Sequence, residues 1–202
     1  VFRNGKIYQQ EYEIGKPLYS VKEVGTADIT GTRQQFWPDG TIFTETVYDY
    51  KILASRLREL AYLNAGLRIS LTDRRVVNED GSFKSEQFYS EEGLREFVRF
   101  IESSREHLIN DVIYLNSEKQ GIPIEVAIMY NTGFSENVHS YVNNINTIEG
   151  GTHLAGFRRA LTRTLKKYAE DSKMLEKVKV EISGDDFREG LTAVISIKVA
   201  EP

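Results

Sequence analysis

The segment 152–168 contains the residues best suited to bind a charged ligand. It holds five basic residues and no acidic one: Arg158, Arg159, Arg163, Lys166 and Lys167. At 100° per residue, the spacings of four and three place Arg159, Arg163 and Lys166 on one helix face, opposite much of a Leu/Phe stripe. Such a face can follow a phosphate backbone, with binding that weakens steeply as salt rises. The alternative is a solvated basic face beside acidic neighbours, which is the favoured interpretation when the helix is taken alone.

A second candidate is the pair Asp185–Asp186 in the loop 183–190. Two carboxylates can suggest a metal site, but hard cations usually recruit more oxygens than one dipeptide supplies. We therefore interpret the loop as a solvated turn between two strands, where Asp and Gly suit the backbone. Three histidines are far apart in sequence and lack ligand spacing: His107, His139 and His153. Because no phosphate-loop, dinucleotide-binding or zinc-protease motif is present, we assign no catalytic and no metal-binding residue.

The composition narrows the class of protein. The 202 residues include no cysteine, which excludes disulfides, thiolate zinc sites and thiol catalysis. This usage fits a reducing cytoplasm, where we expect the protein. With 26 basic and 30 acidic residues the net charge is -4, so nucleic-acid binding would need a local patch. An apolar content of 40% argues against disorder, and no stretch reaches the roughly 18 apolar residues of a membrane helix.

The two ends of the chain suggest a piece of a longer protein. Asn4-Gly5 between strand-prone residues indicates a type I′ hairpin turn, because both central positions need φ > 0. Only three residues precede this turn, so its first arm is very short. The last residues follow directly from the strand-like run 191–199. We therefore expect a segment that begins and ends inside or beside a strand.

The first half of the chain reads as strands around one helix. Strands are predicted over 6–14, 21–24, 31–37 and 67–71. Turns are expected at 25–28 and at Pro38-Asp39-Gly40. Asp49 can cap a helix that ends before Gly66 and carries an apolar stripe of helical period: Ile52, Leu53, Leu57, Leu60 and Ala61. The polar stretch 76–89 is either a junction or part of a hairpin from 71 to 88.

The second half adds two helices and five strands. Ser90 can cap a helix whose buried face comprises Leu94, Phe97, Val98 and Ile101. The helix 152–168 turns another set inward: Leu154, Phe157, Leu161, Leu165 and Tyr168. Strands are predicted over 112–116, 124–130, 136–142, 178–182 and 191–199. Because no βαβα alternation appears, the expected fold class is α+β with two lobes.

Six strings taken together resemble the ATPase subunit of bacterial type IIA topoisomerases. They lie at 3–8, 30–32 with 36–39, 56–64, 141–145, 149–158 and 184–191. The fourth reads Tyr-Val-Asn-Asn-Ile and the fifth Glu-Gly-Gly-Thr-His-Leu-Ala-Gly-Phe-Arg. They occur in order across essentially the whole chain. The resemblance is closer to the gyrase branch of the family than to the topoisomerase IV branch.

The resemblance implies a specific architecture. Residues 1–90 would be the later half of a GHKL-type ATP-binding domain, an α/β sandwich with a mixed sheet covered by helices on one face. Residues 91–202 would be most of the transducer domain, without its C-terminal end, in an α+β fold resembling that of a ribosomal small-subunit protein.

The resemblance also implies nucleotide-binding residues. Thr32, in Thr30-Gly31-Thr32, matches the family threonine that joins a water-linked hydrogen-bond network to adenine, and Gly31 belongs to the same motif. Arg3 matches the arginine at the mouth of the nucleotide pocket, where coumarin-type inhibitors bind. A hydroxyl donates and accepts at once, and a guanidinium offers planar donors, so both residue types suit these roles. Without the resemblance, an ordinary strand threonine and a surface arginine would be the favoured interpretations.

The implied function is that of a DNA gyrase segment, which uses ATP and Mg²⁺ in the intact protein for duplex passage and negative supercoiling. The family's general base, metal ligand and lid would lie before Val1, and its γ-phosphate lysine beyond Pro202. We therefore expect this segment to bind neither cofactor tightly and not to hydrolyse ATP alone. Expected partners are duplex DNA, a gyrase A-type subunit in an A2B2 heterotetramer and a second ATPase subunit, with no membrane.

Three alternatives stay open from the sequence. One is a non-catalytic nucleic-acid-binding module that uses the basic helix 152–168. The second is a topoisomerase IV ATPase subunit. The third is another GHKL ATPase of the mismatch-repair or chaperone type, against which the Phe36-Trp37-Pro38 and Gly-Gly-Thr-His strings weigh.

Overall fold

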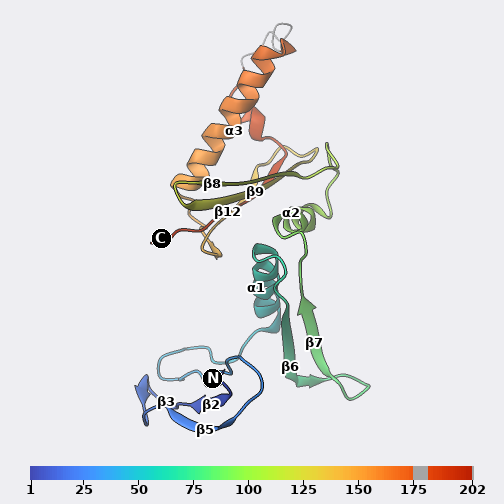
Figure 1. The fold of residues 1–202 in the computed structure, drawn as a ribbon. Helices are drawn as coiled ribbons and strands as arrows, with labels where there is room; N and C mark the ends of the chain where they lie inside the picture. The colour runs from blue at the N-terminus through green and yellow to red at the C-terminus, as the bar shows by residue number, and fades with distance from the viewer. Residues whose placement is uncertain (175–181, 202) are drawn as a thin grey trace. The chain divides into compact units, whose positions relative to one another are not determined.

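The computed structural model describes residues 1–174 and 182–201 (Figure 1). The chain forms two compact units, Val1–Asp49 and Tyr50–Pro202. The strand expected over 178–182 falls on residues 178–181, outside the described residues. The predicted domain boundary near residue 90 is a different division, and it stays a prediction.

The first unit is built on a small antiparallel sheet of order β1-β2-β5. Its strands are β1 (Phe2–Arg3), β2 (Lys6–Gln9) and β5 (Lys22–Thr26). Asn4 and Gly5 have φ of 54° and 75°, which confirms the predicted hairpin turn between β1 and β2. The predicted turn over 25–28 is wrong in its start, because Gly25 and Thr26 still pair with β2.

Two strand predictions in this unit are wrong. The run 6–14 is divided, since Tyr12–Glu13 (β3) turns back onto Lys16–Pro17 (β4) through Ile14 and Gly15. Both turn residues have positive φ, 48° and 75°, as in a two-residue hairpin turn. The sequence did not indicate this turn, because isoleucine favours strands. The run 31–37 pairs only through an isolated bridge between Gly31 and Phe2. The turn that follows it is held by Asp39, whose carboxylate accepts hydrogen bonds from the Thr41 backbone N–H and hydroxyl.

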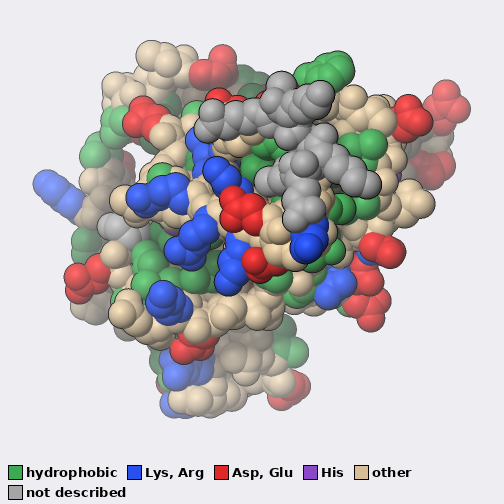
Figure 2. Space-filling model, turned by 90° about the horizontal axis from the view of Figure 1, so that it is seen from above, with side chains coloured by type: hydrophobic (Ala, Val, Ile, Leu, Met, Phe, Trp, Pro, Cys, Tyr) green, Lys and Arg blue, Asp and Glu red, His purple; other side chains and the backbone are tan. Residues whose placement is uncertain are grey.

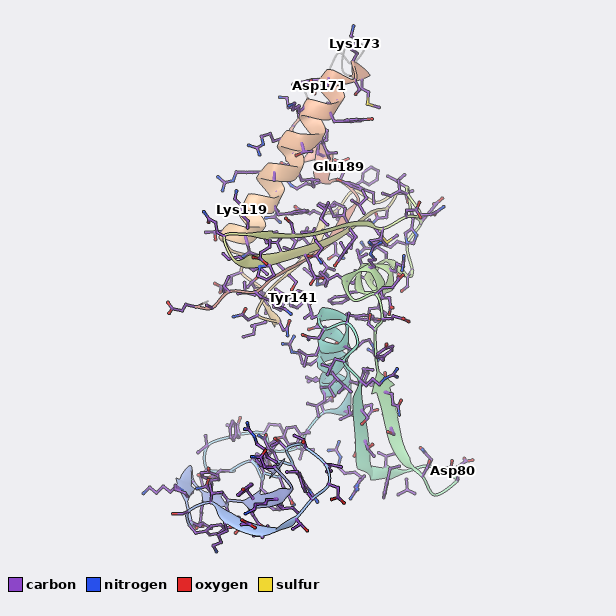
Figure 3. All side chains as sticks on the ribbon, in the orientation of Figure 1. Asp80, Lys119, Tyr141, Asp171, Lys173 and Glu189 are labelled. Carbon is purple, nitrogen blue, oxygen red and sulfur yellow. The ribbon has the colours of Figure 1, made fainter. Side chains whose placement is uncertain are left out.

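The second unit begins with a helix packed on a hairpin. Helix α1 (Tyr50–Leu63) is followed by β6 (Ile69–Val77) and β7 (Phe83–Phe88), which pair antiparallel. The hairpin alternative for 71–88 is therefore correct, and its loop carries Asp80 (Figure 3). Ala54 and Ala61 pack with Phe88. The expectation that Ile52 is buried is wrong, because it lies about 200° around the helix from Ala54 and is 71% exposed.

The centre of this unit is a five-stranded sheet of order β11-β10-β12-β9-β8. The strands are β8 (Ile113–Lys119), β9 (Ile122–Tyr130), β10 (Asn137–Val142), β11 (Ile145–Asn146) and β12 (Leu191–Ile197). Strands β10 and β12 run parallel, and the other pairs are antiparallel. The first six residues of β12 are buried, as expected for an apolar strand covered on both faces. The predicted strands from 112 to 142 and at 191–199 are confirmed, with shifted ends.

Helices cover both faces of the sheet (Figure 1). On one face α2 (Leu94–Glu102) packs Phe97 and Val98 against Met129, Tyr141 and Val194. On the other face α3 (Thr152–Asp171) contributes Leu154, Phe157 and Leu161 to a cluster that contains Ile128, Ala193 and Ile195. The faces differ because successive residues of β12 point to opposite sides.

The predicted buried faces of α2 and α3 are confirmed with one exception. Tyr168 is 64% exposed, whereas it was expected to point inward. The C-terminal part of α3 extends past the described strands of the sheet (Figure 1), so none of these strands lies beneath the ring. No helix in the described parts of the chain combines the length and the apolarity needed to cross a membrane.

Gly190, directly before β12, provides a test of this packing. Its φ is +68°, and a Cβ there would lie 2.3 Å from the Asn131 backbone oxygen and 2.9 Å from that of Gly133. We expect Gly190→Ala to lower the free energy of unfolding by at least about 2 kcal/mol, through strain and overpacking. The measurement is urea unfolding followed by circular dichroism.

The matched control is Gly156→Ala within α3. A Cβ at Gly156 meets nothing within 4 Å, and alanine favours a helix over glycine by roughly 0.5–1 kcal/mol. This variant should therefore be as stable as the wild type or more stable. Equal stabilities for the two variants would contradict the packing described around Gly190.

Candidate functional site

The first group of predicted site residues lies where the chain brings β1 beside Gly31. The Phe2 N–H donates to the Gly31 carbonyl at 2.8 Å, and the Gly31 N–H donates to the Phe2 carbonyl at 3.0 Å. Arg3 and Thr32 are each one residue from this bridge, and both are exposed. The bridge thus holds the segment that contains Arg3 beside the segment that contains Gly31 and Thr32, with Arg3 and Thr32 on opposite sides of the bridge. A Cβ placed on Gly31 would meet nothing within 4 Å, so the backbone there is open to close approach.

A wide apolar hollow lies within the same unit. Its volume is about 1070 Å³, and its lining includes Phe36, Trp37, Phe43 and Tyr48. Phe36 and Trp37 are 71% and 78% exposed, so the Phe-Trp-Pro-Asp string is a surface feature of this unit. Phe36 contacts Tyr48 edge to face, with ring centroids 6.3 Å apart.

The second group of predicted residues lines a basic hollow on α3. Arg159, Arg163 and Lys166 share one face of the helix, as predicted, and they border a hollow of about 880 Å³. Its remaining lining residues are Ala155, Arg158, Thr162, Gly184 and Arg188. Figure 2 shows Lys and Arg side chains gathered beside acidic ones on the face that carries α3. The arrangement can hold an anion that spans several residues of the helix.

Glu136 decides which of these cations are neutralised. One of its oxygens lies 2.7 Å from Nε of Arg158, and the other lies 3.5 Å from Nε of Arg188. Arg188 also pairs with Asp185. Arg159, Arg163 and Lys166 form no ion pair with any residue of 1–174 or 182–201. Within the part of the chain that the structure describes, these three are therefore the cations of the hollow left to attract a ligand.

The Asp185–Asp186 pair has a structural arrangement, as the sequence interpretation favoured. Asp186 accepts a hydrogen bond from the Ser183 backbone N–H at 2.6 Å, which together with the Ser183 hydroxyl lowers the pKa of that carboxyl. Asp185 pairs with Arg188, which the 3₁₀ turn η2 (Asp186–Arg188) carries. Among the described residues, no group of three or more His, Cys, Asp or Glu side chains is placed to hold a metal ion.

Sequence reasoning missed a buried polar cluster around Glu102. This carboxylate is fully buried and accepts hydrogen bonds from the Thr192 hydroxyl at 2.6 Å and the Asn131 side-chain amide at 2.9 Å. Arg105 adds a bond of 3.1 Å. A signal was present, because Glu102 follows Leu94 by eight residues and so falls on the apolar stripe of α2.

Sequence reasoning also did not assign a role to the Asn143-Asn144 pair or to Arg188. All three lie inside strings that carried the resemblance, but each has a contact with a residue more than 25 positions away in the chain: Arg56, Val199 and Thr162, respectively for Asn144, Asn143 and Arg188. Spacing along the sequence gives no access to such contacts.

Comparison with known proteins agrees with the fold and with these strings. A profile of the DNA gyrase B family matches residues 93–202. The DNA gyrase B protein of Cytophaga hutchinsonii is 62% identical over 202 residues, which is 100% of this chain and 42% of the relative. The chain thus spans less than half the length of that curated relative.

Solved structures show the same likeness. The 43K ATPase domain of Thermus thermophilus gyrase B, in complex with an aminocoumarin, matches with a TM-score of 0.83 and 32% identity. The match covers 100% of this chain and 54% of that one. The topoisomerase IV ATP-binding domain of Francisella tularensis shares the fold, with a TM-score of 0.72 and 22% identity over 99% of this chain and 53% of that one.

These likenesses confirm the predicted fold class, because gyrase B ATPase domains carry the same α+β arrangement over the whole chain. They also favour the gyrase branch over the topoisomerase IV branch, since the identity is higher there. With more than half of its residues matched by the family profile, the chain belongs to the DNA gyrase B family.

Proposed function

We propose that this chain is a segment of the ATPase subunit of a bacterial DNA gyrase, an ATP-dependent type IIA topoisomerase. The subunit would use ATP binding and hydrolysis to drive duplex passage and negative supercoiling, and the segment would complete the adenine pocket and relay nucleotide state. The observation that carries the proposal is the likeness of the whole chain to a gyrase B ATPase domain, at a TM-score of 0.83. The whole-chain identity to a gyrase B protein supports it further.

Within this proposal the chain divides near residue 90. Residues 1–90 form the later part of the GHKL ATP-binding domain, and residues 91–202 form most of the transducer domain. Two features support the division: β7 ends at Phe88 and α2 begins at Leu94, and the family profile begins at residue 93. The compact unit that starts at Tyr50 crosses this boundary.

Arg3, Gly31 and Thr32 are the proposed nucleotide-side residues. Their support is the bridge between Phe2 and Gly31, the exposure of the two side chains and the open space above Gly31. In the intact subunit we assign ATP and Mg²⁺ as cofactors, and Arg3 as the residue nearest a bound coumarin-type inhibitor. Partners would be duplex DNA, a gyrase A-type subunit in an A2B2 assembly and a second ATPase subunit, in the cytoplasm.

The nucleotide role is tested with Thr32→Val in the full-length subunit. Valine keeps the shape and removes the hydroxyl, so one net hydrogen bond of about 1 kcal/mol is lost. We expect the KM for ATP to rise about fivefold with kcat little changed, because the lost bond contributes to ground state and transition state alike. Steady-state ATPase assays measure both constants.

Thr32→Ser should restore the wild-type KM, because serine returns the hydroxyl. Thr44→Val is the matched control, since Thr44 is exposed in the same unit and has no assigned role. An unchanged KM in Thr32→Val, or an equal rise in the control, would refute the assignment of Thr32.

A second role is favoured by the cations on α3. We propose that Arg159, Arg163 and Lys166 contact the phosphates of duplex DNA, because they line one hollow and lack ion-pair partners among the described residues. This role is compatible with the gyrase assignment, and it would also suit a non-catalytic nucleic-acid-binding module.

The DNA role is tested by a salt titration of duplex binding to the chain with all three cations replaced by alanine. Each phosphate contact contributes a slope of about −0.9 to log K against log salt, so the plot should become flatter by up to roughly 2.7. The control replaces three exposed cations elsewhere, Lys16, Arg33 and Lys119, and removes the same charge. Equal slopes for the two triple variants would leave net charge as the explanation and reject a specific phosphate face.

A further inference from the structure

The turn between β10 and β11 consists of two asparagines in the left-handed region. Asn143 has φ of 49° and Asn144 has φ of 66°, and the strands on either side pair Val142 with Ile145. Asparagine tolerates this region better than most residues, which suits it to a type I′ turn. Glycine would also adopt this conformation, so the conformation alone does not account for an asparagine side chain at either position.

Asn143 binds the segment that leaves β12. Its backbone N–H donates to the Ile197 carbonyl at 2.9 Å. Its side-chain amide donates to the Val199 carbonyl at 2.8 Å and accepts from the Val199 N–H at 2.9 Å. The amide of Asn143 therefore acts as one more peptide group and continues the parallel β10–β12 pairing beyond the last residue of β12.

Asn144 contacts helix α1 and its C-terminal end rather than the segment after β12. Its backbone carbonyl accepts a hydrogen bond from Arg56 Nη2 at 2.7 Å. Its side-chain amide donates to Asn64 Oδ1 at 3.1 Å, and the Asn64 amide donates in turn to the Leu60 carbonyl at 2.8 Å. Arg56 is also fixed by a 2.9 Å bond to Glu59. Helix α1 is thus held at two points, in its second turn and just after its last residue.

The turn is partly buried on the side of β10, whereas β11 after it is exposed. Tyr141, labelled in Figure 3, lies two residues before Asn143 and is fully buried. Its ring packs with that of Phe97 of α2, with ring centroids 6.0 Å apart. Burial, with a smaller contribution from the Glu59 carboxylate, raises the pKa of the Tyr141 phenol. Asn143 and Asn144 are themselves partly buried, so the hydrogen bonds of the turn are partly shielded from water.

Packing holds α1 on α2 without these asparagines. The Tyr62 and Phe97 rings stack at 5.0 Å, and Leu63 joins the core that contains Val98 and Ala127. Loss of the two asparagine side-chain amides would therefore leave the fold intact. It would change only how the segment after β12 is positioned relative to α1.

We infer that Asn143 and Asn144 are positioning residues that fix the segment after β12 to helix α1. The inference rests on the proposed function in one respect. There, α1 belongs to the ATP-binding part and the exit of β12 to the transducer part, so the turn would couple ATP turnover to DNA supercoiling.

The link itself is tested in the 202-residue chain by hydrogen exchange of the Val199 amide, followed by NMR. Asn143→Gly removes the direct bond, Asn144→Gly removes the amide that contacts Asn64, and glycine tolerates both φ values. Gln120→Gly is the matched control, because Gln120 has φ of 54° in the β8–β9 turn of the same sheet. One net hydrogen bond corresponds to roughly a three- to tenfold change in an equilibrium.

We expect faster exchange at Val199 by that factor in Asn144→Gly as well as in Asn143→Gly, and no change in Gln120→Gly. The effect of Asn144→Gly is the decisive result, because Asn144 does not contact Val199. Unchanged exchange in Asn144→Gly would show that the two halves of the turn are independent and would overturn the inference.

The coupling is tested in the full-length subunit assembled with its A-type partner. In both glycine variants we expect supercoiling per ATP hydrolysed to fall about threefold or more, with kcat for ATP hydrolysis and the melting temperature near the wild-type values. Parallel losses of hydrolysis, supercoiling and melting temperature would mean a merely structural role, and unchanged supercoiling per ATP would mean none; either result overturns the coupling. A wild-type assembly without ATP-dependent supercoiling would overturn the proposed function instead, and the exchange result at Val199 would still decide the link.

Discussion

The arrangement of the second unit depends on one buried carboxylate. Burying an ionised group costs several kcal/mol unless its lone pairs are satisfied, so Glu102 imposes a strict requirement on its neighbours. Thr192, Asn131 and Arg105 meet it, and they come from the start of β12, the end of β9 and the residues after α2. One side chain therefore fixes helix α2 and the two central antiparallel strands at a common point. The close approach of Asn131 to Gly190 follows from this, since the Asn131 backbone N–H also donates to the Gly190 carbonyl at 2.9 Å.

Strand β12 is fixed at both ends, and each end contacts a different part of the second unit. At its start the Glu102 cluster sets the position of Thr192, and Arg188 lies only a few residues earlier, at the basic hollow on α3. At its end Asn143 pairs with Val199, and Asn144 continues the contact to α1. Between the two ends the strand is buried on both faces, so it has little freedom to bend or slide. A rigid central strand is a suitable element for transmitting a displacement from one end to the other.

The features that the sequence predicts well are those set by local chemistry. The Asn4-Gly5 turn follows from the need for positive φ at both positions, and the inward residues of α2 follow from helical period. The errors have two sources: a local turn that residue preferences did not indicate, and the extent of a distant surface. Ile14 reverses the chain although it favours strands, and Tyr168 is exposed because α3 extends past the sheet. The candidate site divides in the same way. Arg159, Arg163 and Lys166 could be placed on one face from spacing, whereas the approach of β1 to the Gly31-Thr32 segment depends on pairing between Phe2 and Gly31.

The basic hollow illustrates how a single acid can define a binding face. Arg158 and Arg188 would repel each other without a shared counter-ion. Glu136 accepts a hydrogen bond from Arg158 on one oxygen and lies 3.5 Å from Nε of Arg188 with the other. This pairing holds η2 against α3, and Glu136 together with Asp185 offsets the two positive charges of Arg158 and Arg188. The three cations that are left lie along about 10 Å of helix, at a rise of 1.5 Å per residue. Their separation suits a ligand with charges repeated along its length better than a single small anion. The described cations that stay unpaired on this face therefore depend on the ion pairs of Glu136 and Asp185, and a count of positive residues in the sequence would not reveal them.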